Sequence, residues 1–490
     1  MAIRIYVTGN RPAPVSTIIS RLAKIILPAV LMLTVGAGCK KDFTSVVAKP
    51  TEVVPHPDQP NIILIIGDDV GYDIPTFFGG RSYSTPNLDY MAANGMTFTQ
   101  FHNQPDGFPS RLQILTGKYN YRNFIRWGYI PVEDKVVGNM MQDIGYSTCY
   151  VGKWQNDGGD ESIKAHGFQN YLVYLPFSDN QRVSRYKTPH IYQDGAFLPK
   201  SQVKNKYSED LFQDYLFNFI DSNINKPFFA IYANNLIAGP YVPTPDDPQY
   251  VDWKTKDENK YDDPAKYNPS MVAYMDKKIG EVVNKIKAAG LADNTLIMFC
   301  GDNATWTGVT SVYHDPLTGR DTTIRGTKTT TNWRGITNPV IAYWPGKIAP
   351  GSVNDNLIDY TDFIPTFAEV AKTGIPEYLQ PSDGVSFYHN LIGATGTNKD
   401  YIKVYWNNGL VPEGETDSVP PEIFVFDYNY KLYDDSSHID VPLSKRYNRF
   451  FDLRTNREEY INDTLRLSEL TPEQVAKREE FIEILKTMRR

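Results

Sequence analysis

The chain has 490 residues, a length that suits one large α/β domain with a smaller partner. Its formal net charge of −7 gives no basic footprint, so nucleic acid is not an expected partner. Aromatic residues make up 13 % of the chain. Sugar-binding surfaces are often rich in such residues, but we favour ordinary core packing as the explanation.

The N-terminal residues have the pattern of a targeting segment. Arg21 and Lys24 precede the apolar run IILPAVLMLTVGAG, which ends at Cys39. This run is short for a membrane span and typical of a signal peptide. We predict a bacterial lipoprotein signal over residues 1–39, with Cys39 as the lipid-modified residue; a plain cleaved signal peptide is the alternative. Residues 40–59 would be a tether, and the protein would be an outer-membrane lipoprotein of the bacterial cell envelope, facing the periplasm or the cell surface.

Residues 60–395 alternate between strand-like and helix-like segments. The strand-like runs are apolar, and each ends in polar residues: 61–69, 146–154, 226–235 and 294–303. The helix-like runs have apolar residues at helical spacing: 85–95, 110–118 and 271–290. This alternation predicts an α/β fold with a large, mixed but mostly parallel sheet covered by helices on both faces. Cys149 and Cys300 lie in apolar strand-like runs and are predicted core residues, not a disulfide or a metal site.

The pattern changes after about residue 395. Short apolar runs punctuated by Pro, Gly and Asp occupy 401–406, 423–433 and 449–453, and a charged helical run covers 471–488. We therefore predict a small C-terminal α+β subdomain over residues 396–490, made of an antiparallel sheet and one helix.

Acidic side chains follow two of the predicted strands. Asp68 and Asp69 follow the run NIILIIG, and Asp302 and Asn303 follow TLIMFCG. Sites in parallel sheets lie beyond the carboxyl ends of the strands, where these carboxylates would repel one another unless a cation neutralised them. Carboxylate and amide oxygens suit Ca²⁺, with Mg²⁺ or Mn²⁺ as alternatives. The simpler interpretation, two unrelated polar turns, is weaker because both pairs occur at strand ends.

Four basic residues are candidates for holding a tetrahedral anion: Arg111, Lys118, Lys153 and Lys328. Arg111 lies in the first turn of a predicted helix, where free N–H groups and the helix dipole favour negative charge. Lys153 follows directly on a predicted strand, and Lys328 lies in the loop RGTKTTT. A single lysine is usually a solvated surface residue, so the set carries more information than any member.

The motifs PNIILIIGDDVGY, TPNLDYMAANGMTFT, PSR…LTGK, GYSTCYVGKW, KPFFAIYANN and FFDLRTNREEY follow one another in order from about Pro60 to the C-terminal region. Through them the chain resembles the sulfatase family of the alkaline phosphatase superfamily. The resemblance implies a sulfuric ester hydrolase fold, with sulfated or anionic carbohydrate as the partner. It also implies that Asp68, Asp69, Asp302 and Asn303 hold calcium, while Arg111, Lys118, Lys153 and Lys328 steady the nucleophile and the sulfate.

The chain departs from the family at the reacting groups. Sulfatases place a Cys or Ser two residues before the proline of the PSR motif and convert it to formylglycine; here that position is Gly107. Glycine has no side-chain atom to oxidise, so no covalent intermediate can form there. Gln155 and Ala238 stand where the resemblance implies histidines. Glutamine can hydrogen-bond but cannot exchange a proton near neutral pH, and alanine can do neither.

Three functions remain open on the sequence alone. The first is a sulfatase-family hydrolase with an altered mechanism, and the second is a non-catalytic binder of sulfated or anionic glycans. The third is a phosphoester or phosphonate hydrolase that uses metal-activated water. Neighbouring side chains offer poor replacements: Asp106 adds another carboxylate, Ser110 suits a helix start, and His314 is more typical of a surface loop.

Overall fold

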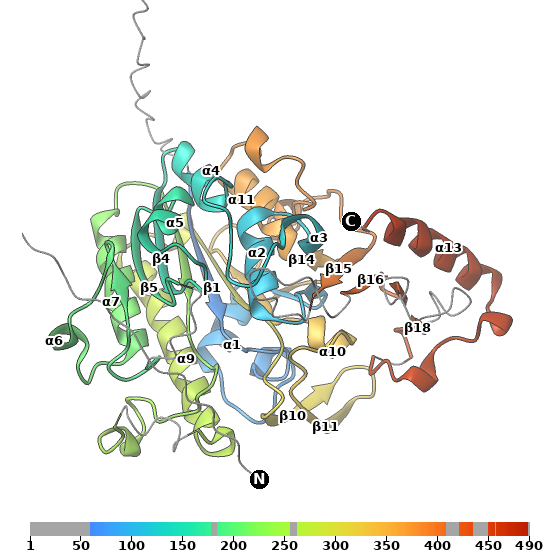
Figure 1. Cartoon of the computed structure of the whole chain (residues 1–490), viewed down its shortest axis with the longest axis horizontal. Coiled ribbons are helices and arrows are strands. Elements are labelled where there is room, and N and C mark those ends of the chain that lie inside the picture. The colour runs from blue at the N-terminus through green and yellow to red at the C-terminus, as the bar shows by residue number, and fades with distance from the viewer. Residues whose placement is uncertain are drawn as a thin grey trace, which may run out of the picture. The chain divides into compact units, whose positions relative to one another are not determined.

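The structure is a computed structural model that describes residues 59–177, 184–254, 262–407, 421–434, 449–455 and 457–488. All of these residues belong to one compact unit, 53–490. The predicted signal peptide, Cys39 and all of the predicted tether except its last residue lie outside the described residues. Figure 1 shows the order of the elements along the chain.

A ten-stranded sheet forms the centre of the unit. Its five middle strands, β9, β1, β8, β4 and β5, run parallel to one another, and the strands toward both edges include antiparallel pairs. The predicted large, mostly parallel mixed sheet is therefore confirmed. In spatial order the strands are β13 (Ser352–Asn354), β2 (Met96–Phe98), β12 (Val340–Tyr343), β9 (Thr295–Gly301), β1 (Asn61–Gly67), β8 (Phe228–Ala233), β4 (Ser147–Lys153), β5 (Asn170–Tyr174), β6 (Tyr192–Gln193) and β7 (Ala196–Phe197).

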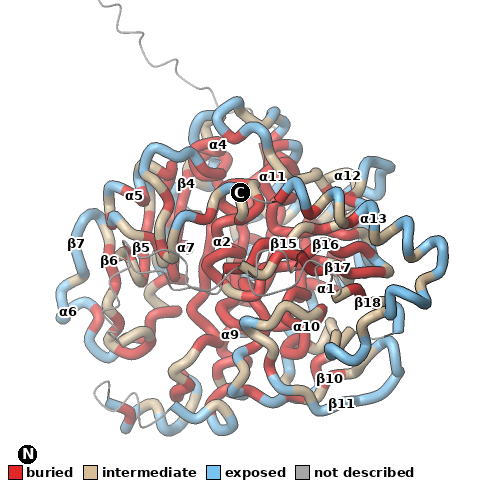
Figure 2. Tube along the Cα trace, turned by 45° about the vertical axis from the view of Figure 1, so that its right-hand side comes forward, coloured by how far each residue is buried: buried red, intermediate tan, exposed pale blue. Residues whose placement is uncertain are grey.

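Both faces of the sheet are covered, which explains why its strands are apolar throughout. In β1, Ile62, Leu64 and Ile66 belong to one core, whereas Ile63 and Ile65 belong to the core on the opposite face. This division follows from the two-residue period of a strand. Figure 2 shows the central strands buried, in contrast to the mostly exposed strand β11.

The helices divide between the two cores. One core includes residues of α2 (Gly107–Thr116), α4 (Val137–Asp143), α5 (Gly159–Ala165), α11 (Phe363–Val370) and α12 (Tyr388–Leu391). The other includes residues of α1 (Pro86–Ala93), α7 (Ser208–Ser222) and α9 (Pro264–Ala288), and the short helix α6 (Lys200–Val203) follows β7. Two short helices, α3 (Asn120–Asn123) and α10 (Trp333–Ile336), complete this part of the chain. None of the helices in the described part of the chain combines the length and apolar character that a membrane crossing needs.

Three smaller sheets accompany the central one. Two are pairs of strands: β10 (Thr310–Asp315) with β11 (Arg320–Arg325), and β3 (Phe101–His102) with β14 (Ile358–Asp359). The third is antiparallel and C-terminal, as predicted, and comprises β15 (Ile402–Trp406), β16 (Glu422–Phe426), β17 (Tyr430–Asp434) and β18 (Phe450–Asp452). Phe481 and Leu485 of α13 (Pro472–Lys486) pack on one face of this sheet.

The predicted helices exist, but two begin earlier than the sequence pattern indicated. The helix predicted over 110–118 begins at Gly107, because Asp106 caps it, and ends before Gly117, which adopts a left-handed φ of 65°. The helix predicted over 271–290 begins at Pro264, with Asp263 as its cap. Cys149 and Cys300 are free and buried, as predicted.

Candidate metal and anion site

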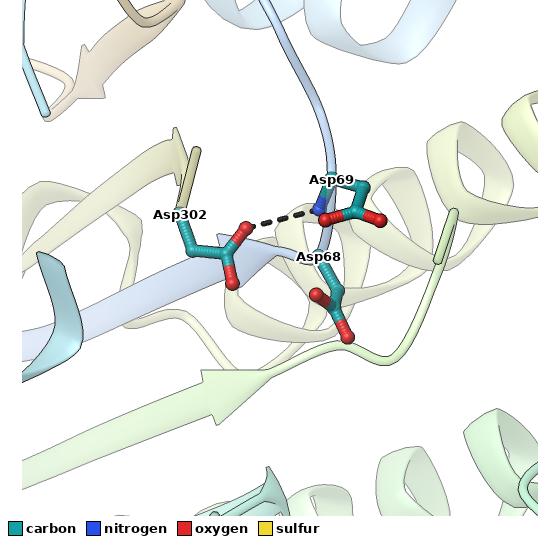
Figure 3. A group of neighbouring side chains, drawn as sticks. All are labelled: Asp68, Asp69 and Asp302. Atoms are coloured by element: carbon teal, nitrogen blue, oxygen red, sulfur yellow. Dashed lines mark hydrogen bonds between the residues drawn. The ribbon is translucent and has the colours of Figure 1, made fainter. Parts of the chain in front are cut away.

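The predicted acids meet because two strands are paired in register to their last residue. Gly67 at the end of β1 lies opposite Gly301 at the end of β9, so Asp68 and Asp302 leave adjacent parallel strands at the same level. Neighbouring strands are about 4.8 Å apart, which brings the carboxylates close together. Both side chains are fully buried, and Figure 3 shows them with Asp69.

The three aspartates and Asn303 present oxygen atoms to a common point. Asp68, Asp69 and Asp302 each offer a carboxylate oxygen, and these atoms all lie within 4.8 Å of one another. The amide nitrogen of Asn303 donates to Asp69 Oδ1 at 2.8 Å, while its Oδ1 is buried without a hydrogen-bond partner in the described structure. A buried, unpartnered amide oxygen beside three carboxylates is the donor set that a hard divalent cation takes.

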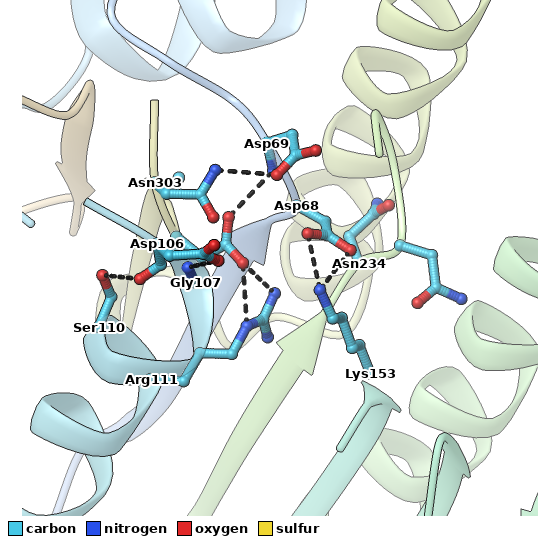
Figure 4. A network of polar contacts seen from close by, with 12 residues as sticks. Asp68, Asp69, Asp106, Gly107, Ser110, Arg111, Lys153, Asn234 and Asn303 are labelled. Carbon is cyan, nitrogen blue, oxygen red and sulfur yellow. Dashed lines mark hydrogen bonds and ion pairs between the residues drawn. The ribbon is translucent and has the colours of Figure 1, made fainter. Parts of the chain in front are cut away.

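Each aspartate is also paired with a basic side chain, and Figure 4 shows the pair of Asp68 and Lys153. Lys153, the last residue of β4, donates to both oxygens of Asp68 at 2.9 Å. Lys328 donates to Asp69 Oδ1 at 2.6 Å. Arg111, in the first turn and a half of α2, donates to Asp302 Oδ2 through Nε at 3.1 Å and Nη2 at 3.0 Å.

Arg185 is a fourth basic residue at this site, and the sequence analysis missed it. Its Nη1 lies 3.5 Å from Asp68 Oδ2, and its guanidinium lies over the ring of Tyr174, the last residue of β5, at 5.6 Å from the centroid. The surrounding sequence, SRYKTPH, has no strand or helix pattern that would have singled it out. Only the fold brings this loop to the end of β1.

Burial and these basic partners shift the pKa values of the acids in opposite directions. Burial alone would raise the pKa of Asp68, but Lys153 and Arg185 hold it well below its usual range. For Asp302 burial prevails over the opposing effect of Arg111 and raises the pKa to about 6. Burial likewise raises the pKa of Asp106, which lies 3.8 Å from Lys328. A divalent cation would favour the charged form of every carboxylate that it contacts.

Gly107 lies where α2 begins, directly against the acids. Asp106 accepts a hydrogen bond from the Gly107 backbone N–H at 2.5 Å. A Cβ atom on Gly107 would lie 2.2 Å from Asp302 Oδ2 and 2.9 Å from Asn303 Oδ1, and the first distance is shorter than any tolerable contact. The Asp302 carboxylate therefore occupies the space in which a side chain at position 107 would begin.

The remaining predicted residues lie at different distances from this cluster. Gln155 is two residues beyond Lys153; its backbone has a left-handed φ of 57°, and its Oε1 is buried without a partner in the described structure. Lys118 follows the opposite end of α2, about 16 Å along the helix from Gly107, and is not brought to the acids. His314 lies on the β10–β11 hairpin, 2.8 Å from Asp321 and partly exposed.

The segment after β8 contributes side chains that the sequence analysis did not consider. Asn234 and Asn235 follow β8, the strand between β1 and β4, and both are fully buried. Neither side-chain polar atom of Asn235 has a hydrogen-bond partner among the described residues. The Tyr241 hydroxyl is similarly buried and unpartnered; burial raises its pKa, with a further contribution from nearby Asp69. Ala238 lies in the same segment and is buried.

Comparison with known proteins agrees with this arrangement. The family model named Sulfatase matches residues 60–373, well over half of the chain and nearly all of the part that builds the central sheet. The chain belongs to the sulfatase family. The family is part of the alkaline phosphatase superfamily, so the predicted membership is confirmed.

Other sulfatases are similar along most of the chain. Human arylsulfatase A is 28 % identical over 416 residues, covering 77 % of this chain and 74 % of its own. N-acetylgalactosamine-6-sulfatase of the dog Canis lupus familiaris is 27 % identical over 374 residues, covering 70 % of this chain and 68 % of its own.

Solved structures share the fold. A protein crystallised with its substrate D-glucosamine-2-N,6-O-disulfate has a TM-score of 0.68 and 18 % identity, covering 88 % of this chain and 97 % of its own. A protein crystallised with k-i-k-neocarrahexaose has a TM-score of 0.66 and 22 % identity, covering 88 % and 92 %. A phosphonate monoester hydrolase from Silicibacter pomeroyi has a TM-score of 0.61 and 17 % identity, covering 88 % and 94 %.

Proposed function

We propose that this protein holds Ca²⁺ and binds the sulfate group of a sulfated or otherwise anionic carbohydrate, without the covalent sulfate hydrolysis of its family. The observation that carries this proposal is at the start of α2. The acids and the basic side chains are assembled around Gly107, but position 107 has no side chain, and Asp302 fills the space in which one would begin.

The metal part of the proposal is supported by the donor set. Three converging carboxylates and the unpartnered Oδ1 of Asn303 are hard oxygen ligands, and Ca²⁺ accepts such a mixed shell without strict geometry. Mg²⁺ or Mn²⁺ would use the same atoms. When bound, the cation would supply positive charge that favours an anionic ligand beside it.

The anion part is supported by the charge balance. Asp69 and Asp302 each have one basic partner and Asp68 has two, so the side chains that meet there have no large excess of either sign. A divalent cation and a singly charged sulfate ester group entering together would change the net charge of the site by only one unit. Once the acids contact the cation, the N–H groups of Arg111, Lys153 and Lys328 can turn toward sulfate oxygens.

The loss of covalent chemistry is supported by three positions of the family pattern. We assign Gly107 to the formylglycine position and Gln155 and Ala238 to the positions of the two proton-transferring histidines. None of these residues can attack sulfur or protonate a leaving oxygen near neutral pH.

Hydrolysis by water activated at the metal is the second candidate. The observation in its favour is the unpartnered hydroxyl of Tyr241, buried near Asp69, which could donate a hydrogen bond to a leaving oxygen. Its raised pKa makes it a weak acid, so we rank this candidate below binding without turnover.

The decisive experiment measures binding and sulfate release in the same preparation. We expect the purified protein to bind a sulfated oligosaccharide only in the presence of Ca²⁺ and to release no sulfate from it or from an aryl sulfate. Sulfate release by the unmodified protein at rates typical of sulfatases would overturn the proposal.

A Gly107→Cys variant, produced with the machinery that oxidises the cysteine, tests whether the absent nucleophile alone accounts for the loss of hydrolysis. We expect little turnover, because Asp302 must move to admit the side chain and proton transfer is still lacking. Full activity in this variant would mean that Gly107 alone accounts for the loss and that the rest of the pocket is competent.

We also propose that the protein is held at the bacterial cell envelope by a lipid on Cys39. Metabolic labelling with a fatty-acid analogue tests this, with Cys39→Ser as the control that should lose the label.

A further inference from the structure

A second feature of the molecule is a groove of about 990 Å³ near one edge of the central sheet. Its walls come from three segments, residues 184–190, 198–205 and 250–254, which include α6 and the residues after β7. A volume of this size is enough for a ligand larger than one sulfate group.

The groove is strongly basic. Four of its described lining residues are lysines, Lys187, Lys200, Lys204 and Lys254, and none is a carboxylate. The chain as a whole has a net charge of −7, so this concentration of positive charge is local. Lys200, Lys204 and Lys254 are exposed, which leaves their ammonium groups at the surface of the groove. Such a surface attracts anions and repels cations.

The groove also has an aromatic wall. Tyr250 and Trp253 line it, and the ammonium group of Lys187 lies 4.2 Å from the centroid of the Tyr250 ring. Lys187 donates to the backbone oxygens of Tyr250 at 2.5 Å and of Trp253 at 2.7 Å, so it fixes this wall in place. Trp253 is buried, but Tyr250 is partly exposed, and its ring beside exposed charges suits a ligand with an apolar face and anionic substituents.

One wall of the groove is adjacent in sequence to a residue of the metal and anion site. Arg185, which contacts Asp68, lies between Ser184 and Lys187, and both of these neighbours line the groove. Two residues of extended chain span at most about 7 Å. A ligand held at Asp68 would have to span the Arg185 side chain as well as this stretch of chain to reach the groove, which an oligosaccharide can do and a monosaccharide cannot.

We propose that the groove binds the rest of an anionic oligosaccharide when one of its sulfate groups occupies the site at Asp68, Asp69 and Asp302. Further sulfate or carboxylate groups of the chain would lie along Lys200, Lys204 and Lys254, with a sugar ring against Tyr250. The inference rests on the proposed binding of sulfate, and it narrows the ligand from a single sulfated sugar to a chain that carries several anionic groups.

The test compares two ligands and two double variants in the presence of Ca²⁺. The ligands are a sulfated hexasaccharide and a monosulfated monosaccharide, and their dissociation constants are measured by calorimetry. The groove variant is Lys200→Glu/Lys204→Glu. The control, Lys135→Glu/Lys347→Glu, makes the same change in net charge at exposed lysines outside the groove. All four side chains are exposed, so both variants should fold.

We expect the groove variant to bind the hexasaccharide at least 10-fold more weakly than the wild type and the monosaccharide within twofold of it. The control variant should bind both ligands with dissociation constants within twofold of those of the wild type. Equal weakening in both variants would mean that only net charge matters and would overturn the proposal. The proposal would also be overturned if the wild type bound the hexasaccharide no more tightly than the monosaccharide. Displacement of the bound hexasaccharide by polyglutamate of equal charge, as effectively as by free hexasaccharide, would overturn it too.

The same measurements separate this inference from the proposed function. If the monosaccharide does not bind at all, the sulfate site at the aspartates has failed. A hexasaccharide that still loses affinity in the groove variant alone would then keep the groove as an anion-binding surface. If the monosaccharide binds and the hexasaccharide is indifferent to the groove variant, only the groove has failed.

Discussion

Two buried clusters in the described part of the protein bring aspartates together with a lysine, and they differ in how completely the carboxylates are hydrogen-bonded. In the second, the closed cluster, Lys399 donates to Asp359 at 2.6 Å and to Thr361 at 2.9 Å and lies 2.8 Å from Asp362. The Tyr119 hydroxyl donates to Asp359 at 2.9 Å. Asp359 and Asp362 also cap the short helix η5 (Tyr360–Asp362), so their oxygens are engaged locally.

The cluster at Asp68, Asp69 and Asp302 is built differently. Its carboxylates come from the ends of separate strands, and the Oδ1 of Asn303 beside them has no partner among the described residues. Burial, charge and a lysine partner are common to both clusters, so these properties do not identify a functional site. Unsatisfied oxygens that converge on one point do, because a buried polar atom without a partner is costly unless a ligand engages it.

The closed cluster should prove structural, and Lys399→Met tests this with the largest expected effect. The substitution leaves Asp359 and Asp362 buried without their cation, which costs about 3–5 kcal/mol of unfolding free energy. Urea unfolding measures the loss, with Lys347→Met as an exposed control. The folded variant should bind Ca²⁺ as the wild type does. A variant of unchanged stability, or one that loses Ca²⁺ binding while folded, would erase the distinction between the clusters.

A buried acid close to the candidate site but outside its ligand set should also behave as a structural group. Glu209 accepts hydrogen bonds from the Tyr232 hydroxyl and the Asn235 backbone N–H, and burial raises its pKa from 4.5 to about 7. The folded state therefore holds the Glu209 proton more tightly than the unfolded state. The stability that this provides is full below about pH 4.5 and is lost as the pH rises through about 7.

Glu209→Gln removes this titration. Between pH 5 and pH 8 the wild type should lose up to about 3 kcal/mol of unfolding free energy relative to the variant. Urea unfolding at several pH values gives the difference, and Glu377→Gln, at an exposed acid, should follow the wild type. If the unfolding free energies of the wild type and of Glu209→Gln changed with pH in parallel, Glu209 would not retain its proton in the folded state.

Asp69→Asn tests whether the open cluster binds a metal. The amide keeps the size of the side chain but removes one of three ligand charges, so Ca²⁺ affinity should fall by about 100-fold, or about 2.7 kcal/mol. Calorimetric titration measures it, and Asp293→Asn is the exposed control with the same change in charge. Ca²⁺ should raise the melting temperature of the wild type and of the control but not of Asp69→Asn. Equal affinities would contradict the assignment.

Much of the open cluster could be predicted from the sequence, because its members follow strands. The apolar runs ending in Asp68 and Asp302 indicated parallel strands, and parallel strands present their carboxyl ends at one edge. The position of Lys153 at this edge follows from the same rule, because it is the last residue of a parallel strand. The fold class and the C-terminal sheet were predictable for a similar reason, since strand and helix periodicity extends over many residues.

The rest depended on loops, for which the sequence has no periodic signal. Arg185 and Tyr241 reach the cluster through irregular segments whose path is set by tertiary packing. The basic groove was equally unpredictable, because its lysines are scattered over three segments. Lys118 was grouped with the site as one of four basic residues and by the family resemblance, and the position of its side chain relative to the anion stays a prediction; its backbone follows the end of α2 opposite Gly107.

The helix α2 connects the two clusters. Arg111 near its first turn pairs with Asp302, while Tyr119, just past its last turn, bonds to Asp359 of the closed cluster. The helix is about 15 Å long and behaves as a stiff rod over that length. A substitution in the closed cluster that shifts this helix would move the Arg111 guanidinium, so the affinity for the anion can change while the aspartates still bind Ca²⁺ and no residue that contacts the ligand is altered.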